Sequence, residues 1–539
     1  MKKKLLVLLL MVVPMLTFAQ EKGLDQKIDA AFQPVSDFFS NLIFFTIPIA
    51  GIDVPFVLLL LVGSALFFTI YFKFPNIFHF KTAINVVRGK YDELDQHVAG
   101  DPALAIGGDI KGTIKDESTE GEVTHFQALA TAVSGTVGNG NIAGVALAIA
   151  LGGPGATFWM VVCGFLGMST KFVECTLGVQ YRDVGEDGTV YGGPMYYISK
   201  GLKERGFETF GKIVAVIFAI FCIGGSFGGG NAAQSNQATV VLKELMGLES
   251  SGAGFWIGVV MAIVVGVIII GGIKRIASVT EKVVPFMAVL YLLACLYILG
   301  ANFSLIDDAF SLIFREAFNP TAIGVGGVIG VLLVGFKRAA FSNEAGAGSA
   351  SIAHSAVKTK YSASEGLVAL LEPFIDTVVI CTMTALVIII FNFGGDASGA
   401  TIFQYGGDGA GAVLIDGVSY EGAGITSKAF AQYIPYSNVF LTVAVVLFAV
   451  STMISWSYYG LQSWKFLFGR GKAADMTYKL LFLLFVVIGA SASMKSIWAF
   501  SDAMIFAMVF PNMVGLYFLF PVVKEQLKRY TDAIKESKA

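Results

Sequence analysis

Long apolar runs alternate with shorter polar segments along most of the chain. A helix needs about 20 mainly apolar residues to cross a bilayer, and in lipid it satisfies its own backbone groups. The pattern therefore predicts an all-α polytopic membrane protein. It predicts eleven spans, at 54–73, 125–151, 155–180, 212–236, 254–272, 279–300, 321–354, 362–391, 436–464, 477–494 and 497–521.

The polar segments between the spans predict the remaining organisation. The first residues read MKKK, then an apolar run and a small-residue site near Ala19, which predicts a signal peptide over 1–19; a short uncleaved anchor is the alternative. The other predicted segments are an interfacial stretch at 20–53 with an amphipathic part from residue 32, a cytoplasmic loop at 74–124, an amphipathic connector at 301–320 and a basic cytoplasmic tail at 522–539.

Lysine and arginine gather in alternate loops, and such loops face the cytoplasm. Segments 74–124, 181–211, 465–479 and the tail are basic, whereas 237–253 and 392–428 carry few basic residues. With eleven spans, this bias places the mature N-terminus outside and the C-terminus inside. Eleven is one extra span plus two units of five, at 125–300 and 321–521. A unit with an odd number of spans inverts its topology when it is repeated.

Composition agrees with the membrane prediction and excludes several classes of function. The chain has 539 residues, of which 55% are hydrophobic and 14% are charged, against about 25% charged in soluble domains. Its net charge of −2 gives no reason to expect a nucleic-acid partner. The five cysteines and four histidines show no metal-ligand spacing. The sequence contains no phosphate-binding loop and no catalytic constellation, so an ATP-driven pump or an enzyme is not expected.

The span at 125–151 contains TVGNGN at residues 136–141, near the expected midplane. Glycine weakens a helix, and asparagine competes for its backbone hydrogen bonds. A broken helix survives in a membrane where it lines an enclosed, hydrated cavity. The break frees N–H groups on one half-helix and carbonyls on the other. The first suit a carboxylate and the second suit a cation, which together match an amino acid and a metal ion.

A second interrupted segment, FSNEAGAGSA, occupies residues 341–350. Two broken helices in corresponding positions of the two halves indicate the substrate site of a transporter. The alternative is glycine used for close helix packing. Two other classes, a channel and a membrane enzyme or sensor, lack a pore-lining repeat and a catalytic or signalling segment.

Three motifs carry a family resemblance over about residues 54–520. They are TVGNGNIAGVALAI with GGPGATFWM at 152–160, GFKRAAFSNEAGAGSASIAHSA at 335–356, and STMISWSYYG at 451–460. This set resembles the sodium:alanine/glycine symporter family. The resemblance implies a leucine-transporter-like fold with a 5+5 inverted repeat and one extra N-terminal helix. It also implies sodium-coupled uptake of alanine or glycine through a bacterial inner membrane. Proton coupling, or a larger neutral amino acid such as glutamine, is the alternative.

The resemblance also directs attention to four core helices. In helix 1, backbone N–H groups near Gly138, Gly140 and Asn141 would meet the substrate carboxylate, although Asn141 could equally bond the broken backbone. In helix 6, carbonyls at the break and the Asn343 amide suit an ammonium group. The full substrate-binding prediction is Thr136, Gly138, Gly140, Asn141, Phe227, Gln234, Phe341, Ser342, Asn343, Gly346, Thr452 and Trp456.

Sodium would be held by oxygens from helices 1 and 8. The predicted sodium-binding residues are Ser134, Val137, Phe448, Ser451 and Thr452. In helix 3, Phe227 would wall the pocket, with Asn231 and Gln234 further along the same face; packing through small residues is the alternative. Thr452 and Trp456 are four residues apart, so they share a face, and Trp456 would limit the size of the substrate side chain.

Acids at membrane depth are costly and by default functional. Glu174, Glu344 and Asp502 are predicted as gating or proton-binding groups, and Glu344 could pair with Lys337 or Arg338. Two further acids, Glu372 and Asp376, are open between such a role and a structural one.

Overall fold

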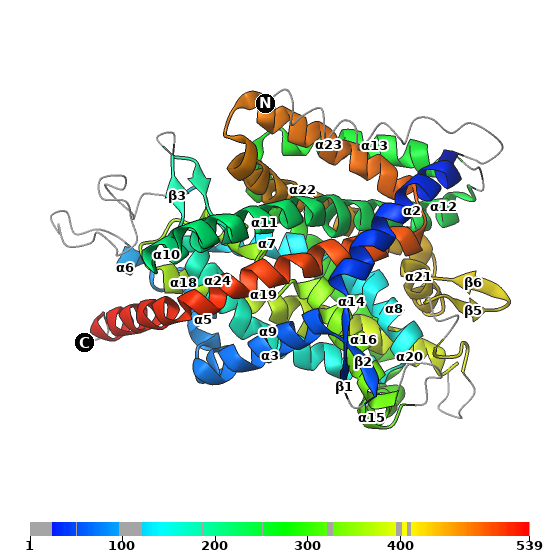
Figure 1. Cartoon of the computed structure of the whole chain (residues 1–539). Helices are drawn as coiled ribbons and strands as arrows, with labels where there is room; N and C mark the ends of the chain where they lie inside the picture. The colour runs from blue at the N-terminus through cyan, green and yellow to red at the C-terminus, as the bar shows by residue number, and fades with distance from the viewer. Residues whose placement is uncertain are drawn as a thin grey trace.

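A computed structural model describes residues 24–49, 51–95, 121–185, 188–248, 250, 252–320, 327–394, 401–406 and 411–537. The predicted signal peptide and part of the loop at 74–124 lie outside these residues. Helices make up most of the described chain, and α24 runs through the whole assembly to the C-terminal end (Figure 1).

The helices follow the order of the predicted spans, with short helices between them. The α-helices are α2 (Leu24–Ile43), α3 (Phe56–Tyr71), α4 (Pro75–Phe78), α5 (Phe80–Val87), α6 (Asp92–Asp95), α7 (His125–Thr136), α8 (Val145–Gly152), α9 (Gly155–Gln180), α10 (Pro194–Glu204), α11 (Glu208–Phe227), α12 (Ala233–Met246), α13 (Ala253–Ile269), α14 (Gly272–Ala301), α15 (Ile306–Phe318), α16 (Gly327–Asn343), α17 (Ala350–His354), α18 (Ser362–Ala369), α19 (Leu371–Pro373), α20 (Thr382–Asn392), α21 (Ala423–Ala431), α22 (Ser437–Phe468), α23 (Lys472–Ser491) and α24 (Met494–Glu536). The described residues also contain three π-helical segments, η2 (Gly140–Gly144), η3 (Gly228–Ala232) and η5 (Phe374–Cys381), and one 3-10 helix, η4 (Phe303–Leu305).

Seven helices in the described part of the chain are long and apolar enough to cross a membrane. An eighth candidate is the pair α7 and α8 with η2, which is bent by 51° at the predicted break. Helices α3 and α13 are apolar but have 16 and 17 residues. The chain is therefore a multi-pass helical membrane protein.

The connecting segments differ from the all-α prediction, because they contain three antiparallel hairpins. These pair β1 (Thr46–Ile49) with β2 (Ile52–Pro55), β3 (Asp183–Val184) with β4 (Val190–Tyr191), and β5 (Val413–Ile415) with β6 (Val418–Tyr420). Each hairpin pairs the backbone N–H and carbonyl groups of a segment that lies outside the long helices. Figure 1 shows β3 and α10 near one end of the helices, and β5 and β6 beside α21 near the other.

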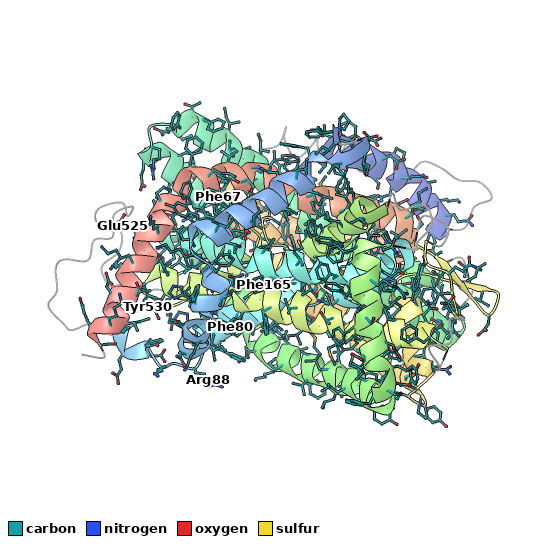
Figure 2. All side chains as sticks on the ribbon, turned by 90° about the horizontal axis from the view of Figure 1, so that it is seen from below. Phe67, Phe80, Arg88, Phe165, Glu525 and Tyr530 are labelled. Atoms are coloured by element: carbon teal, nitrogen blue, oxygen red, sulfur yellow. The ribbon has the colours of Figure 1, made fainter. Side chains whose placement is uncertain are left out.

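Aromatic contacts attach the N-terminal helices to α24. Helix α2 crosses α24 (Figure 1), and the ring centroids of Phe32 and Phe500 are 5.1 Å apart. Phe67 of α3, labelled in Figure 2, contacts Tyr517 and Phe520 of α24, with centroid distances of 5.5 Å to each. Helix α24 also contacts the helices of the core. The two N-terminal helices are therefore attached to the core through α24.

Glycine allows α16, which leads into the second break, to lie directly against α9. A Cβ atom on Gly335 would lie 2.6 Å from the carbonyl oxygen of Ala156 and 2.7 Å from Cβ of Trp159. Both of these neighbouring atoms belong to α9, so neither can move away from an added Cβ without a shift of that helix. Small residues at such crossings let helices approach closely in membranes.

We expect Gly335→Ala to destabilise the protein, because the added methyl overlaps the backbone of α9. Overpacking of this kind costs about 1–3 kcal/mol. Thermal unfolding of the purified protein in detergent would measure the effect as a lower midpoint than in the unsubstituted chain. The control is Gly300→Ala in α14, where a Cβ meets nothing within 4 Å and the substitution favours the helix. Equal midpoints for the two variants would contradict the proposed contact.

Candidate functional site

The first break lies between α7 and η2. Helix α7 begins with a capping box, in which the Thr124 hydroxyl accepts from the Gln127 N–H and the Gln127 side chain accepts from the Thr124 N–H. It ends at Thr136, and Val137 is extended, with φ −73° and ψ 90°. The chain becomes helical again at Gly140. The Gly and Asn residues of the motif therefore occupy the interruption itself.

Side chains bond the backbone N–H groups that this break frees. The Gly138 N–H donates to Oδ1 of Asn141 at 2.9 Å. The Asn139 N–H donates to Oε1 of Gln234 at 3.0 Å, and the Asn139 amide donates to the Gln234 carbonyl at 3.1 Å. Asn141 thus stabilises the broken backbone, which was one of its two predicted roles.

The second break separates α16 from α17. Glu344, Gly346 and Gly348 all have positive φ, at 55°, 94° and 84°. Glycine adopts this region freely, whereas glutamate there is uncommon and needs support from its surroundings. The Asn343 amide donates to Oγ1 of Thr377 at 2.9 Å, and its oxygen accepts from the Ala345 N–H at 3.0 Å. Both ends of the Asn343 amide thus hold the break in this structure, and its contact with an ammonium group stays a prediction.

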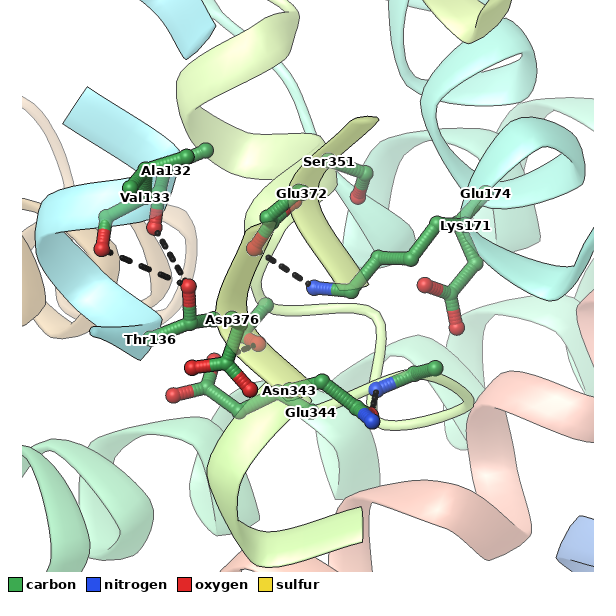
Figure 3. Close-up of polar contacts among 12 residues, drawn as sticks. Ala132, Val133, Thr136, Lys171, Glu174, Asn343, Glu344, Ser351, Glu372 and Asp376 are labelled. Carbon is green, nitrogen blue, oxygen red and sulfur yellow. Dashed lines mark hydrogen bonds and ion pairs between the residues drawn. The ribbon is translucent and has the colours of Figure 1, made fainter. Parts of the chain in front are cut away.

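The two breaks meet, and Asp376 of η5 joins them. A Cβ atom on Gly140 would lie 3.5 Å from Cα of Ser342. The Asn141 amide donates to Oδ1 of Asp376 at 2.5 Å, and the Ser342 hydroxyl donates to its Oδ2 at 2.9 Å. Figure 3 shows Asp376 beside Asn343 and Glu344 of the second break. Its depth in a predicted span was the sequence signal for this residue.

Helices α7 and α22 cross at a cluster of oxygen atoms. The Thr452 hydroxyl donates to the Ser134 carbonyl at 3.0 Å, and the Ser134 hydroxyl donates to the Ser451 carbonyl at 2.8 Å. The Ser451 hydroxyl in turn donates to the Phe448 carbonyl at 2.9 Å. Four of the five residues predicted to bind sodium are thus in contact, and the fifth, Val137, directly follows the end of α7.

Gly138, Gln234 and Thr452 come together beside the first break. A Cβ atom on Gly138 would overlap Oγ1 of Thr452 and lie 3.0 Å from Oε1 of Gln234. Thr136, at the end of α7, directs its hydroxyl back to the carbonyls of Ala132 and Val133, as Figure 3 shows. Thr452 and Gln234 can lie this close to the first break because residue 138 has no side chain.

Trp456 of α22 lies between the second break and η3. Its indole N–H donates to Oε1 of Glu344 at 2.9 Å, and its side chain is fully buried. A Cβ atom on Gly230 would overlap the indole ring. The structure thus brings Trp456 to the second break, together with Phe341, Ser342 and Gly346.

The prediction that Phe227, Asn231 and Gln234 share one face is wrong. The segment η3 between them is π-helical, and each π-turn holds more residues than an α-turn, which changes the register. The Phe227 ring stacks on Phe485 of α23 with centroids 4.5 Å apart, and the Asn231 amide donates to the Phe482 carbonyl at 2.6 Å. These two residues face α23, and Gln234 alone of the three reaches the first break.

Glu344 does not pair with the neighbouring cations. Lys337 and Arg338 both bind Oδ2 of Asp502, with a distance of 3.0 Å from Nζ of Lys337. Glu344 instead accepts from the Ser349 hydroxyl at 2.5 Å and from Trp456. The backbone turn at Glu344 directs its carboxylate away from α16, which is why the sequence spacing misled the prediction.

An aromatic pair covers the same face of the breaks as the Asp502 ion pair. The rings of Phe341 and Trp498 stack with centroids 4.9 Å apart, and the Arg338 guanidinium lies over both, at 5.4 Å and 5.2 Å. A Cβ atom on Gly144 would lie 3.6 Å from the Trp498 ring. Sequence reasoning missed Trp498. A tryptophan at the start of a predicted span is difficult to distinguish from an interfacial anchor.

Glu174 and Asn512 support the second break from the other side. The Asn512 amide donates to Oε1 of Glu174 at 2.7 Å and to the Gly346 carbonyl at 2.8 Å. Asn512 was also missed. An asparagine within an apolar span is the signal that would have found it, because such a group needs a partner in the membrane.

Five buried ionisable side chains form a continuous series next to the breaks, which we term the buried ion-pair chain. Lys171 binds Glu372 at 3.0 Å (Figure 3), and the other oxygen of Glu372 lies 3.7 Å from Nε2 of His354. Nδ1 of His354 is 2.5 Å from Glu365, which also binds His125. Sequence analysis named Glu372 alone, because the five residues come from α7, α9, α17, α18 and α19 and are far apart in the chain.

Two helices that break and meet within a multi-pass helical bundle define the chain as a secondary transporter in architecture. A family model described as the sodium:alanine symporter family matches residues 45–539. The chain belongs to that family, whose members are transporters and not enzymes.

The chain is also similar to individual transporters. The chain is 38% identical to the sodium/alanine symporter AgcS of Methanococcus maripaludis over 482 residues, which cover 89% of this chain and 95% of that protein. It is 32% identical to the probable sodium/glutamine symporter GlnT of Bacillus subtilis, covering 78% of this chain and 81% of that one. The crystal structure of MhsT in complex with L-phenylalanine matches with a TM-score of 0.48 and 14% identity, covering 76% of this chain and 99% of that chain.

We expect Gly138→Ala to abolish transport while the protein still folds. The new methyl would overlap Oγ1 of Thr452, press against Gln234 and displace both side chains from the first break. Uptake of labelled alanine into proteoliposomes measures the loss, and size-exclusion elution of the purified variant checks folding. The matched control is Gly63→Ala in α3, where a Cβ meets nothing within 4 Å. Uptake by Gly138→Ala at the level of this control would remove Gly138 from the site.

Proposed function

We propose that the chain is a sodium-coupled symporter that carries a small neutral amino acid, alanine or glycine, into the cell. The observation that carries the proposal is the meeting of the two breaks, with Gly140 close to Ser342 and with Thr452 and Gln234 packed directly against Gly138. Membership of the sodium:alanine symporter family supports both the cation and the class of substrate.

The amino acid binds at the meeting of the breaks. Backbone N–H groups at Gly138, Gly140 and Asn141 receive its carboxylate, which replaces the Asn141 side-chain oxygen as acceptor for Gly138. Carbonyls of the second break, at Phe341 and Ser342, receive its ammonium group. These contacts recognise what all amino acids share, so the side chain is selected by the surrounding walls.

Sodium is carried at the crossing of α7 and α22. The oxygens of Ser134, Ser451, Thr452 and Phe448 already lie within hydrogen-bond distance of one another, as carbonyl and hydroxyl pairs. Sodium prefers several oxygen ligands of this kind, and freed carbonyls at Val137 add to them. Binding of the ion exchanges the hydrogen bonds of the hydroxyl groups for ligand bonds and fixes α7 to α22.

Transport follows alternating access between two halves of a 5+5 inverted repeat, preceded by the span at α3. The chain lies in a bacterial inner membrane with the C-terminus in the cytoplasm. Asp502, with Lys337, Arg338 and the stacked pair Phe341 and Trp498, forms the outer gate. Glu174 and Glu344 hold the second break in the closed arrangement.

Uptake of labelled alanine into proteoliposomes, with and without an inward sodium gradient, tests the proposal. We expect uptake above equilibrium with the gradient alone. A channel would equilibrate the label without a gradient, and a sensor would not move it. Competition by unlabelled glutamine stronger than that by glycine would favour the glutamine-type alternative, which the similarity to GlnT supports.

We expect Thr452→Val to raise the sodium concentration needed for half-maximal uptake, because it preserves the shape of the side chain and removes one oxygen. Thr442→Val in the same helix is the matched control, since the Thr442 hydroxyl bonds the Val241 carbonyl away from the crossing. Initial rates of uptake over a range of sodium concentrations measure the change. Identical sodium dependence in the two variants would exclude Thr452 from the sodium site.

We expect Trp456→Ala to broaden selectivity, because a large buried wall beside the second break is lost. Each methylene that newly fits gains about 0.8 kcal/mol of burial. Competition by valine, leucine and glutamine against labelled alanine measures the breadth. The control is Trp464→Ala in the same helix, where the ring packs on Phe468. Weaker alanine binding without broader competition would show that Trp456 supports the fold and does not face the substrate.

A further inference from the structure

The buried ion-pair chain contains two polar atoms that face each other without hydrogen-bond partners. They are Nε2 of His354 and Oε2 of Glu372, which are 3.7 Å apart. Both side chains are 0% exposed. Buried polar atoms are nearly always hydrogen-bonded, so this pair requires an explanation.

The other contacts of the buried ion-pair chain determine which nitrogen of His354 lacks a proton. Glu365 lies against Nδ1 of His354 on one oxygen and Nδ1 of His125 on the other. A carboxylate only accepts, so the proton of neutral His354 sits on Nδ1. Its Nε2 then presents a lone pair to the Glu372 carboxylate, and two acceptors oppose each other. One added proton at Nε2 converts this repulsion into a charge-assisted contact.

Charge balance favours the same addition. With both histidines neutral, the five residues carry one cation, Lys171, against two carboxylates, Glu365 and Glu372. One proton brings the group to neutrality, and unpaired buried charge is costly. The other ionisable groups that interact with these residues add mainly negative charge or none: Glu174 and Cys175 of α9, Glu344 at the second break, Asp376 of η5 and Tyr459 of α22.

A proton is the ligand that this geometry accepts. No group of three His, Cys, Asp or Glu side chains in the described residues is arranged to hold a metal ion. The His125 side chain at the end of the series is 10% exposed, whereas those of Glu365, His354, Glu372 and Lys171 are 0% exposed.

We infer that His354 and Glu372 form a proton-binding site, in which Nε2 of His354 binds one proton and then donates a hydrogen bond to the facing carboxylate of Glu372. The site lies on α17 and α19, directly after the second break. Protonation therefore strengthens the attachment of α17 to α19, and loss of the proton weakens it. Only the consequence for transport rests on the proposed function; binding of the proton does not.

Nitrogen NMR of histidine-labelled protein in lipid tests the site directly, because the chain has four histidines. Between about pH 10 and pH 5 we expect His354 to change from the neutral Nδ1–H form to the doubly protonated form. His354→Gln assigns the signal by its loss, and Glu372→Gln, which removes the facing carboxylate, should shift the titration to lower pH. The control is His79→Gln, which changes a histidine outside the buried ion-pair chain and should leave the titration unaltered. A His354 ring that keeps one protonation state across this range in the unsubstituted protein overturns the inference.

Sodium-driven alanine uptake over the same pH range tests the consequence. We expect a several-fold change of rate with one transition, which is retained in His79→Gln and lost in His354→Gln and Glu372→Gln. Uptake that is equal at every pH, in a protein that does transport with sodium, refutes the link of the site to transport and leaves the proposed function intact. Absence of sodium-driven uptake at any pH refutes the proposed function, while the NMR titration still decides the proton site.

Discussion

The site depends on the need of every backbone N–H and carbonyl in a membrane for a partner. A helix that breaks at depth exposes such groups, and this protein bonds them with side chains, two of them from other helices. Asn141 of η2 and Gln234 of α12 accept from the first break, and Asn512 of α24 donates to a carbonyl of the second. Because α12 and α24 carry two of these partners, the site cannot form before the helices have packed.

Asp376 extends this dependence to both halves of the molecule. Its carboxylate accepts from Asn141 of the first break and Ser342 of the second, so the two interruptions are held by one side chain. Movement of either break relative to Asp376 costs its own hydrogen bond to a carboxylate that the other break also bonds. This arrangement gives the fold a physical means of coupling events at the two breaks.

Two groups of ion-paired side chains at membrane depth have different surroundings. Asp502 pairs with Arg338 and with Lys337, whose side chain is 35% exposed. The buried ion-pair chain from Lys171 to His125 is enclosed almost completely. The first group therefore reaches the surface of the protein. Enclosure makes the second sensitive to a single proton, because no water compensates an unmatched charge.

The sequence by itself determined the membrane class, the helical character of the chain and the positions of both breaks. Hydropathy, glycine and asparagine act locally, through helix propensity and the length of a span, and local effects can be read from neighbouring residues. Tertiary structure decided the partners of the polar side chains. The π-helical segment η3 turned Phe227 and Asn231 toward α23, and the left-handed turn at Glu344 directed its carboxylate to Trp456. The buried ion-pair chain joins five helices, and none of its contacts except that of His354 with Glu365 joins residues closer than 18 positions in the sequence. Such pairings are set by how helices cross, which spacing along the chain does not contain.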